Sequence, residues 1–196
     1  MAGCVGAGKT TLVEILAGKN KTGHTTGRVS FPSASNTPSA SPRIGFVPQQ
    51  DILPPMLTVF EALLFAARLR LPESVSEADK CARVHAVMEK LGIETLMNVR
   101  IGWNGGSGGR GISGGEMRRV SIGLELVARP DVLILDEPTS GSVIYLSASS
   151  SRFLISSTGL DSVSAAKVAN VLQAVAHDPD NPTAVIASIH QPRHVP

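Results

Sequence analysis

The chain of 196 residues has the size of one α/β domain with its own core, and its hydrophobic content of 42% excludes a disordered protein. A net charge of only +2 gives little support to a protein that binds nucleic acid or an anionic membrane surface. Its two cysteines make no disulfide framework and indicate a reducing compartment, and the lack of a run of about 18 apolar residues predicts no membrane-spanning helix.

Apolar runs and capping residues predict strands that alternate with helices along the chain. Helices are expected at 9–17, 58–71, 76–91, 113–129 and 162–176. Strands are expected at 28–31, 44–47, 132–135 and 184–189. Two stretches are typical of loops, the low-complexity segment 32–42 and the glycine-rich segment 98–111. The alternation predicts an α/β fold in which helices pack on a mainly parallel sheet.

Three of these helices begin with side chains suited to capping. Thr58 and Glu61 have the spacing of a capping box, and Ser76 with Asp79 makes a similar start. Ser113 is placed to cap the helix that ends before a proline.

A phosphate-binding pattern, G-x-x-x-x-G-K-[ST], opens the chain as GCVGAGKTT at 3–11. Its glycines let the backbone turn tightly and direct N–H groups at phosphate oxygens, and the following helix adds its positive end. Lys9 is expected to contact the β- and γ-phosphates, and Thr10 to ligate Mg²⁺. The predicted nucleotide-binding residues of this loop are Gly3, Cys4, Val5, Gly6, Ala7, Gly8, Lys9, Thr10 and Thr11.

Two adjacent carboxylates, Asp136 and Glu137, follow the apolar strand VLIL. Asp136 suits the outer shell of Mg²⁺, and Glu137 suits the general base that orients an attacking water. Solvated carboxylates at a strand end are the structural alternative. The phosphate loop upstream favours the catalytic assignment.

A second anion site is expected where the helix after residue 112 begins. The Ser113 hydroxyl and the N–H groups of Gly114 and Gly115 could hold a γ-phosphate. Because Lys9 already provides one phosphate cradle, this second site calls for another nucleotide, most economically that of a partner subunit. An ordinary N-cap followed by glycines is the alternative.

Gln49 and His190 each follow a predicted strand, so both lie at the strand ends where parallel sheets bind ligands. Gln49 could reach Mg²⁺ or the attacking water, and His190 could hydrogen-bond the γ-phosphate. Both are candidate catalytic residues, and Gln49 is also a candidate metal ligand.

These segments closely resemble the nucleotide-binding domain of ABC transporters, specifically a fungal-like version of the G (white/brown, eye-pigment-type) subfamily. The resemblance covers nearly the whole chain. It rests on GAGKTTL at 6–12, GFVPQQDILPPMLTVFEALLFAARLRLP at 45–72, GISGGEMRRVSIGLELVARPDVLILDEPTSG at 111–141, LDS at 160–162 and SIHQP at 188–192.

The resemblance implies a P-loop ATPase with ATP and Mg²⁺, which works as a dimer and powers substrate transport through a transmembrane domain at the cytosolic face of a membrane. It also implies a helical subdomain at about 58–128. The implied roles are Walker A for 3–11, the Q-loop glutamine for Gln49, the signature for Ser113, Gly114, Gly115 and Glu116, Walker B for Asp136 and Glu137, the D-loop aspartate for Asp161, and the switch histidine for His190. Many other ABC proteins have Gln where Glu116 stands.

Three departures from the family pattern lead us to expect a partial domain over 1–196. The strand before Walker A and the adenine-stacking aromatic are not found, and no transmembrane domain follows, so this fragment alone is expected in the cytosol. In addition, the 18 residues at 142–159 separate PTSG from LDS. Removing them restores the family pattern, which indicates a retained intron; a genuine insertion loop remains the alternative.

Two other functional classes stay open. A soluble ABC-type ATPase, as in DNA repair or translation, would typically carry coiled-coil insertions or tandem cassettes. A nonfunctional truncated fragment would bind ATP weakly or not at all.

Overall fold

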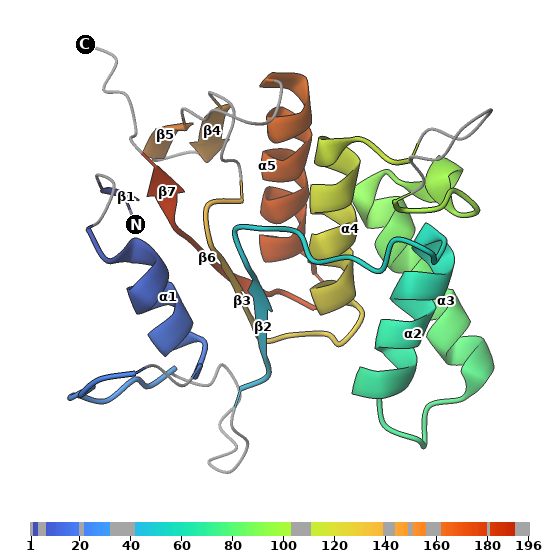
Figure 1. Cartoon of the computed structure of the whole chain (residues 1–196), viewed down its shortest axis with the longest axis horizontal. Coiled ribbons are helices and arrows are strands. Elements are labelled where there is room, and N and C mark those ends of the chain that lie inside the picture. The colour runs from blue at the N-terminus through green and yellow to red at the C-terminus, as the bar shows by residue number, and fades with distance from the viewer. Residues whose placement is uncertain are drawn as a thin grey trace.

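The computed structural model describes residues 2–3, 7–19, 22–31, 42–102, 111–138, 144–148, 151–155, 162–179 and 181–190 (Figure 1). Its helices are α1 (Lys9–Leu16), α2 (Val59–Arg70), α3 (Glu77–Leu91), the 3₁₀ turn η1 (Glu94–Leu96), α4 (Gly114–Leu126) and α5 (Ser162–Ala176). Its strands are β1 (Ala2–Gly3), β2 (Ile44–Val47), β3 (Val132–Leu135), β4 (Ile144–Ala148), β5 (Ser151–Ile155), β6 (Ala184–Ala187) and β7 (Ile189–His190).

The sheet is parallel, with β3 between β2 and β6. In the central register Val132 pairs with Ile44 on one side and with Ala184 on the other. The short strand β1 pairs in parallel with β7, which continues the chain beyond β6. The predicted α/β fold with a parallel sheet is confirmed.

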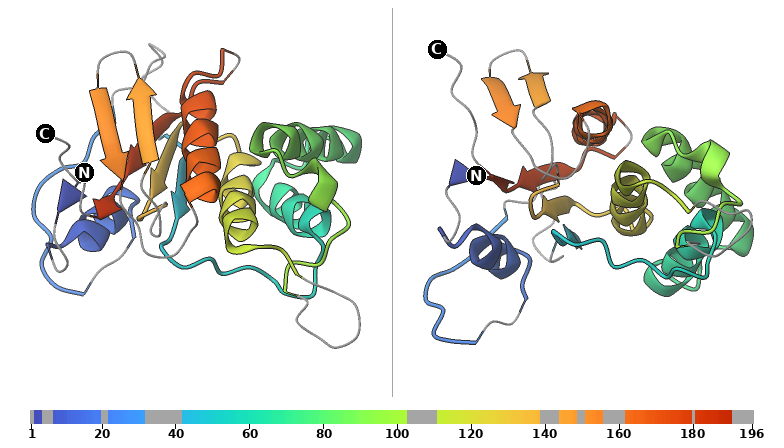
Figure 2. Two further views of the ribbon diagram at one scale, coloured as in Figure 1. Left: turned by 90° about the horizontal axis from the view of Figure 1, so that it is seen from above. Right: turned by 45° about the horizontal axis from the view of Figure 1, so that its top comes forward.

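Helices cover both faces of this sheet, with α1 on one face and α5 on the other (Figure 2). The side chains of β3 alternate accordingly, as the two-residue period of a strand requires. Val132 and Ile134 pack with Val13 of α1, whereas Leu133 and Leu135 join the larger core with α2, α3, α4 and α5. The continuous apolar run VLIL is therefore explained by burial on both faces.

The helices α2 and α3 pack against α4 and form the side of the molecule farthest from α1 (Figure 1). Gly123 permits this contact, because a Cβ atom there would lie 2.8 Å from Leu91 Cδ1 and 2.9 Å from Leu63 Cδ2. The assignment of 58–128 as a separate subdomain stays a prediction.

The predicted caps are confirmed. Complete capping boxes begin α2 at Thr58 and α4 at Ser113, and the Ser76 side chain accepts the N–H of Asp79 at the start of α3. Each side chain satisfies a backbone group that the first helical turn leaves without a partner. Within the described part of the chain, no helix combines the length and apolar character that a bilayer crossing requires.

Several predicted strand boundaries are wrong. Residues 28–31 form no strand; positions 28–30 are exposed, and Phe31 packs instead on the cluster around Val13. The strand predicted at 184–189 is divided at Ser188, because β6 pairs with β3 and β7 pairs with β1. The strand before the phosphate loop was expected to be missing, but a two-residue strand, Ala2–Gly3, runs into the first glycine of that loop. The first helix ends at Leu16, one residue earlier than expected.

Part of the segment at 142–159 forms the antiparallel strands β4 and β5, and its origin as a retained intron or a genuine insertion stays a prediction. Ile144 of β4 pairs with Ile155 of β5, and Ala148 pairs with Ser151. The strand β4 contacts α5. The predicted loop at 32–41 and the glycine-rich residues 103–110 lie outside the described residues.

Candidate nucleotide site

The phosphate loop leads into α1 through Gly8, whose φ of +76° lies in the left-handed region that favours glycine. Ala7, Gly8, Thr10 and Thr11 are exposed, so an anion can approach the positive end of α1. Gly3 forms the end of β1. The remaining loop residues predicted to bind nucleotide, Cys4, Val5 and Gly6, lie outside the described residues.

Lys9 is the buried member of the first turn of α1, with 8% of its surface exposed. Its Nζ atom lies 3.7 Å from Oε1 of Glu137, which is also buried. A buried ammonium group requires an anionic or hydrogen-bonding partner. The loop and the end of β3 therefore meet through opposite charges.

Gln49 contacts the other oxygen of the same carboxylate. Its Nε2 atom donates a hydrogen bond of 3.0 Å to Oε2 of Glu137. Glu137 has a φ of +45°, an uncommon conformation for a residue with a side chain. Such conformations are held by their surroundings and cluster at functional sites. Lys9 and Gln49, predicted from separate motifs, thus converge on the carboxylate of Glu137.

Asp136 is held by Ser188, the residue that separates β6 from β7. The Ser188 hydroxyl donates a 2.6 Å hydrogen bond to Oδ1 of Asp136 and accepts the N–H of Glu137 at 2.9 Å. Asp136 and Ser188 have 1% and 0% of their surfaces exposed. The sequence analysis assigned no role to Ser188, although it begins the segment SIHQP that carried the family resemblance.

Arg118 was also missed by the sequence analysis. It lies in the second turn of α4 with 3% of its surface exposed, and its guanidinium group contacts residues near both Gln49 and Asp136. The available signal was a charged residue on a helix whose neighbouring residues Val120 and Ile122 are buried. The sequence pattern does not show which groups the Arg118 guanidinium contacts.

The start of α4 forms a closed network of its own. Ser113 N–H donates to Oε2 of Glu116 at 2.7 Å, and the Ser113 hydroxyl accepts from Glu116 N–H at 3.4 Å. The hydrogen bond from the Ser113 backbone holds the pKa of Glu116 below its usual range. Gly115 is closely packed, because a Cβ atom there would lie 2.5 Å from Ser164 Cβ. Ser113 and Gly115 therefore have structural roles in addition to their predicted role in binding phosphate.

The structure does not bring every predicted residue into one cluster. The helix α4, which begins after Ser113, lies on the opposite face of the sheet from α1 (Figure 2). The backbone of His190 pairs with Gly3 at the edge that carries the phosphate loop. Asp161 lies outside the described residues, and the placement of the His190 side chain is likewise outside them.

The residues at the sheet edge suit a hard cation only together with a phosphate ligand. The donors are the carboxylate of Asp136, the hydroxyl of Thr10 and the amide of Gln49, which are oxygen ligands of the kind Mg²⁺ uses alongside substrate phosphates. Among the described residues, no group of three or more His, Cys, Asp or Glu side chains could hold a metal ion. The donor set therefore fits a metal bound with a nucleotide.

A family model described as ABC transporter matches residues 1–140, which is most of the chain. The chain belongs to the ABC transporter family. Within that family it is a nucleotide-binding domain, and several of its curated relatives are named as members of the G family. ABC transporter G family member 26 of Arabidopsis thaliana is 41% identical over 192 residues, which cover 98% of this chain and 24% of that protein.

Two further comparisons agree. A Saccharomyces cerevisiae protein named as a probable ATP-dependent permease is 46% identical over 189 residues, which cover 96% of this chain and 16% of that protein. This ABC domain thus spans a quarter or less of the length of these relatives. A metal-chelate type ABC transporter, described in an inward-facing conformation, matches 97% of this chain and 62% of its own chain with a TM-score of 0.66 and 21% identity. That likeness supports the fold.

Proposed function

We propose that this domain binds ATP with Mg²⁺ at residues 3–11 and hydrolyses it as half of a dimer. The observation that carries the proposal is the meeting of Lys9 and Gln49 at the two oxygens of Glu137. A phosphate-binding lysine, a polar amide and a carboxylate base are the parts that phosphoryl transfer to water requires.

The contacts of Glu137 support a sequence of events in which ATP binding separates the base, Glu137, from Lys9. Lys9 pairs with Oε1 of Glu137 at 3.7 Å. The β- and γ-phosphates carry more negative charge than one carboxylate, so they compete for Lys9 when ATP binds. Oε1 then becomes available to accept a proton from the water that attacks the γ-phosphorus, while the bond from phosphorus to the bridging oxygen breaks. Mg²⁺ held near Thr10 and Asp136 would neutralise phosphate charge.

The start of α4 is proposed to act on the nucleotide of the second domain. The helix α4, which Ser113 caps, lies on the opposite face of the sheet from α1 (Figure 2), and this supports a role at a separate phosphate. The N–H groups of Gly114 and Gly115 precede the first intrahelical hydrogen bonds, so they remain suited to an anion. We assign Glu116, Asp161 and His190 to the nucleotide site of the closed dimer because of their positions in the family motifs.

The energy of hydrolysis is proposed to drive substrate transport through a transmembrane domain, with this domain on the cytosolic face of the membrane. Support comes from the G family relatives, which extend well beyond the matched region. The competing classes are a soluble ABC-type ATPase and a domain fragment without activity. Transmembrane segments encoded in the same transcript would favour the transporter, and failure of the purified chain to bind ATP would favour the fragment.

The test compares two versions of the domain, the 196-residue chain and one without residues 142–159. Both are assayed for MgATP binding by calorimetry and for phosphate release. We expect the 196-residue chain to turn over ATP more slowly than about 1 per second, the lower end of the ordinary enzyme range, and the shorter version to be faster. ATP binding by neither version would refute the proposal.

A further inference from the structure

Arg118 of α4 links two chain segments that are far apart in the sequence. Its guanidinium group lies within hydrogen-bond distance of five acceptors outside its own helix, three of which share the two hydrogens of Nη1. The acceptors are the carbonyl oxygens of Pro48 at 2.6 Å, Gln49 at 3.4 Å, Asp136 at 2.9 Å and Pro138 at 3.2 Å, and Oδ1 of Asp51 at 2.9 Å.

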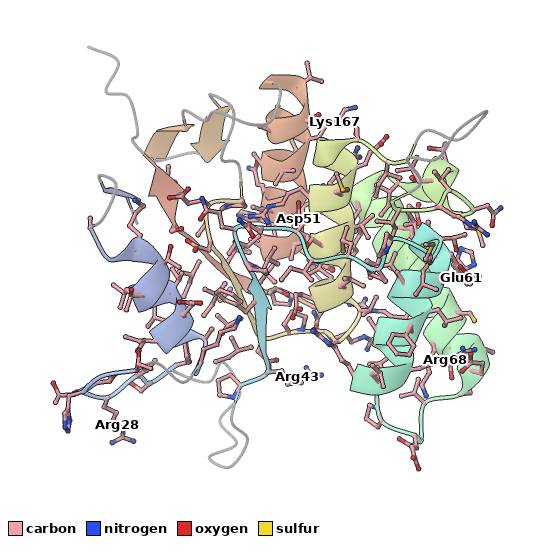
Figure 3. All side chains as sticks on the ribbon, in the orientation of Figure 1. Arg28, Arg43, Asp51, Glu61, Arg68 and Lys167 are labelled. Atoms are coloured by element: carbon pink, nitrogen blue, oxygen red, sulfur yellow. The ribbon has the colours of Figure 1, made fainter. Side chains whose placement is uncertain are left out.

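These acceptors belong to two segments that leave the sheet side by side. Residues 48–51 follow β2, and residues 136–138 follow β3. The ladder between the two strands extends as far as the hydrogen bond from Asp136 N–H to Val47 C=O at 2.9 Å. Farther along, the segments are joined through the Arg118 guanidinium and by the hydrogen bond between Gln49 and Glu137. Asp51 marks the point where the first segment passes α4 on its way to α2 (Figure 3).

We propose that Arg118 is a positioning residue, whose guanidinium group holds residues 48–51 against residues 136–138 so that Gln49 reaches Glu137. The inference rests on the proposed ATPase function, because it concerns the placement of the residues assigned to hydrolysis. Arg118 has no proposed contact with nucleotide and acts through the backbone on either side of the site.

An arginine suits this position better than other cations. A planar guanidinium offers five N–H donors in fixed directions and can contact carbonyls from two segments at once, whereas a lysine ammonium is a compact group with three donors. The buried setting also requires that these donors be satisfied. Lysine at 118 should therefore keep the charge but lose part of the link.

The neighbouring residue provides a matched control. Arg119 is also an arginine of α4 with 8% of its surface exposed, and it also donates to backbone carbonyls. Its Nη1 atom contacts the carbonyl oxygens of Leu91 and Gly92, where α3 ends. It therefore stabilises the contact of α3 with α4 and leaves residues 48–51 and 136–138 untouched.

The first experiment needs no ATP turnover. Amide hydrogen exchange is measured by mass spectrometry on the 196-residue chain and on its Arg118→Met, Arg118→Lys and Arg119→Met variants. We expect exchange in 48–51 and 136–138 to accelerate about tenfold or more in Arg118→Met, the change that follows the loss of a charge-assisted hydrogen bond. Arg118→Lys should be intermediate, and it remains informative if the methionine variant does not fold. Equal acceleration in Arg119→Met would overturn the proposal.

The second experiment separates positioning from a general loss of stability. In the version without 142–159, Arg118→Met should lower kcat about tenfold or more with little change in KM, the effect of misplacing a reacting group. In a Gln49→Ala background the same change should add almost nothing, since Arg118 acts through Gln49. Multiplicative losses would overturn the proposal. If the parent version showed no turnover, the proposed function would fail, and the exchange experiment would still decide the role of Arg118.

Discussion

The Nζ atom of Lys9 lies 3.7 Å from Oε1 of Glu137, and both side chains are about nine-tenths buried. The residue expected to hold phosphate therefore already neutralises the residue expected to act as base. We therefore expect ATP binding to exchange one anionic partner of Lys9 for another.

We expect Lys9→Ala to weaken MgATP binding about tenfold to a hundredfold, the loss typical of a hydrogen bond to a charged group. Calorimetry with MgATP measures the change. Lys19→Ala is the matched control, because Lys19 lies beyond the other end of α1 with its Nζ atom over the Phe46 ring. Unchanged affinity in Lys9→Ala would contradict the phosphate assignment.

Replacing Glu137 by Gln should retain ATP binding and lower the hydrolysis rate about a hundredfold or more, because an amide cannot accept the proton of the attacking water. The closed dimer should then accumulate with ATP, which gel filtration detects. Glu125→Gln serves as the control, since Glu125 is a carboxylate of α4 that pairs with Arg70. If Glu137→Gln turned over ATP at the parental rate, the base would have to be another residue.

Ser113→Arg should block dimer closure while leaving ATP binding by one domain intact, because the larger cation would occupy the partner's phosphate position. The loss of an N-cap by itself costs about 0.5–2 kcal/mol of stability. Ser76→Arg removes the equivalent cap of α3 and controls for that cost. Dimerisation should therefore fail only in the Ser113 variant. Loss of ATP binding by the monomer would show that Ser113 serves its own nucleotide.

The free energy of unfolding should depend on pH through Glu116, the acidic residue of the α4 capping box. The Ser113 N–H lowers the pKa of Glu116 from its usual value of 4.5. A lowered pKa means that the folded state favours the carboxylate, so its contribution is present above pH 4.5 and is lost as the pH falls through the folded-state pKa. Glu116→Gln keeps an acceptor without this titration. We measure the free energy of unfolding in urea at pH 7 and below pH 4. The difference in this free energy between the parent and Glu116→Gln should be smaller at the lower pH. A constant difference would exclude this linkage.

Deletion of 142–159 should raise both dimer formation and ATP turnover, because it rejoins Gly141 to Leu160 and removes the hairpin that contacts α5. The gain should appear chiefly in turnover, because the deletion restores the spacing between PTSG and LDS beside the predicted base. Equal turnover with and without the segment would favour a genuine insertion that the domain accommodates. Transcript sequence that reads through these codons would refute the intron hypothesis directly.

Local features of the fold were predictable, and long-range ones were not. The boxes at Thr58 and Ser113 involve residues three positions apart, so spacing alone reveals them. The contacts of Arg118 with Pro48 and of Ser188 with Asp136 join residues 70 and 52 positions apart. Such contacts depend on how strands are ordered in the sheet, which periodicity does not specify.

The errors in strand prediction have a similar origin. Residues 184–189 are uniformly apolar up to Ser188, and the pattern could not show that the strand changes partners there. Val29 and Phe31 favour strand by composition, yet Val29 is exposed and no pairing accompanies it in the described residues. The motif residues were easier to identify because phosphate chemistry restricts both residue type and spacing.

The close contact between Gly115 and Ser164 has a mechanical consequence. With no Cβ atom at Gly115, the first turns of α4 and α5 touch directly, and packed interiors transmit displacement because they resist compression. A displacement of the start of α4 is therefore expected to displace the start of α5 as well. Any side chain larger than glycine at 115 would force the starts of the two helices apart.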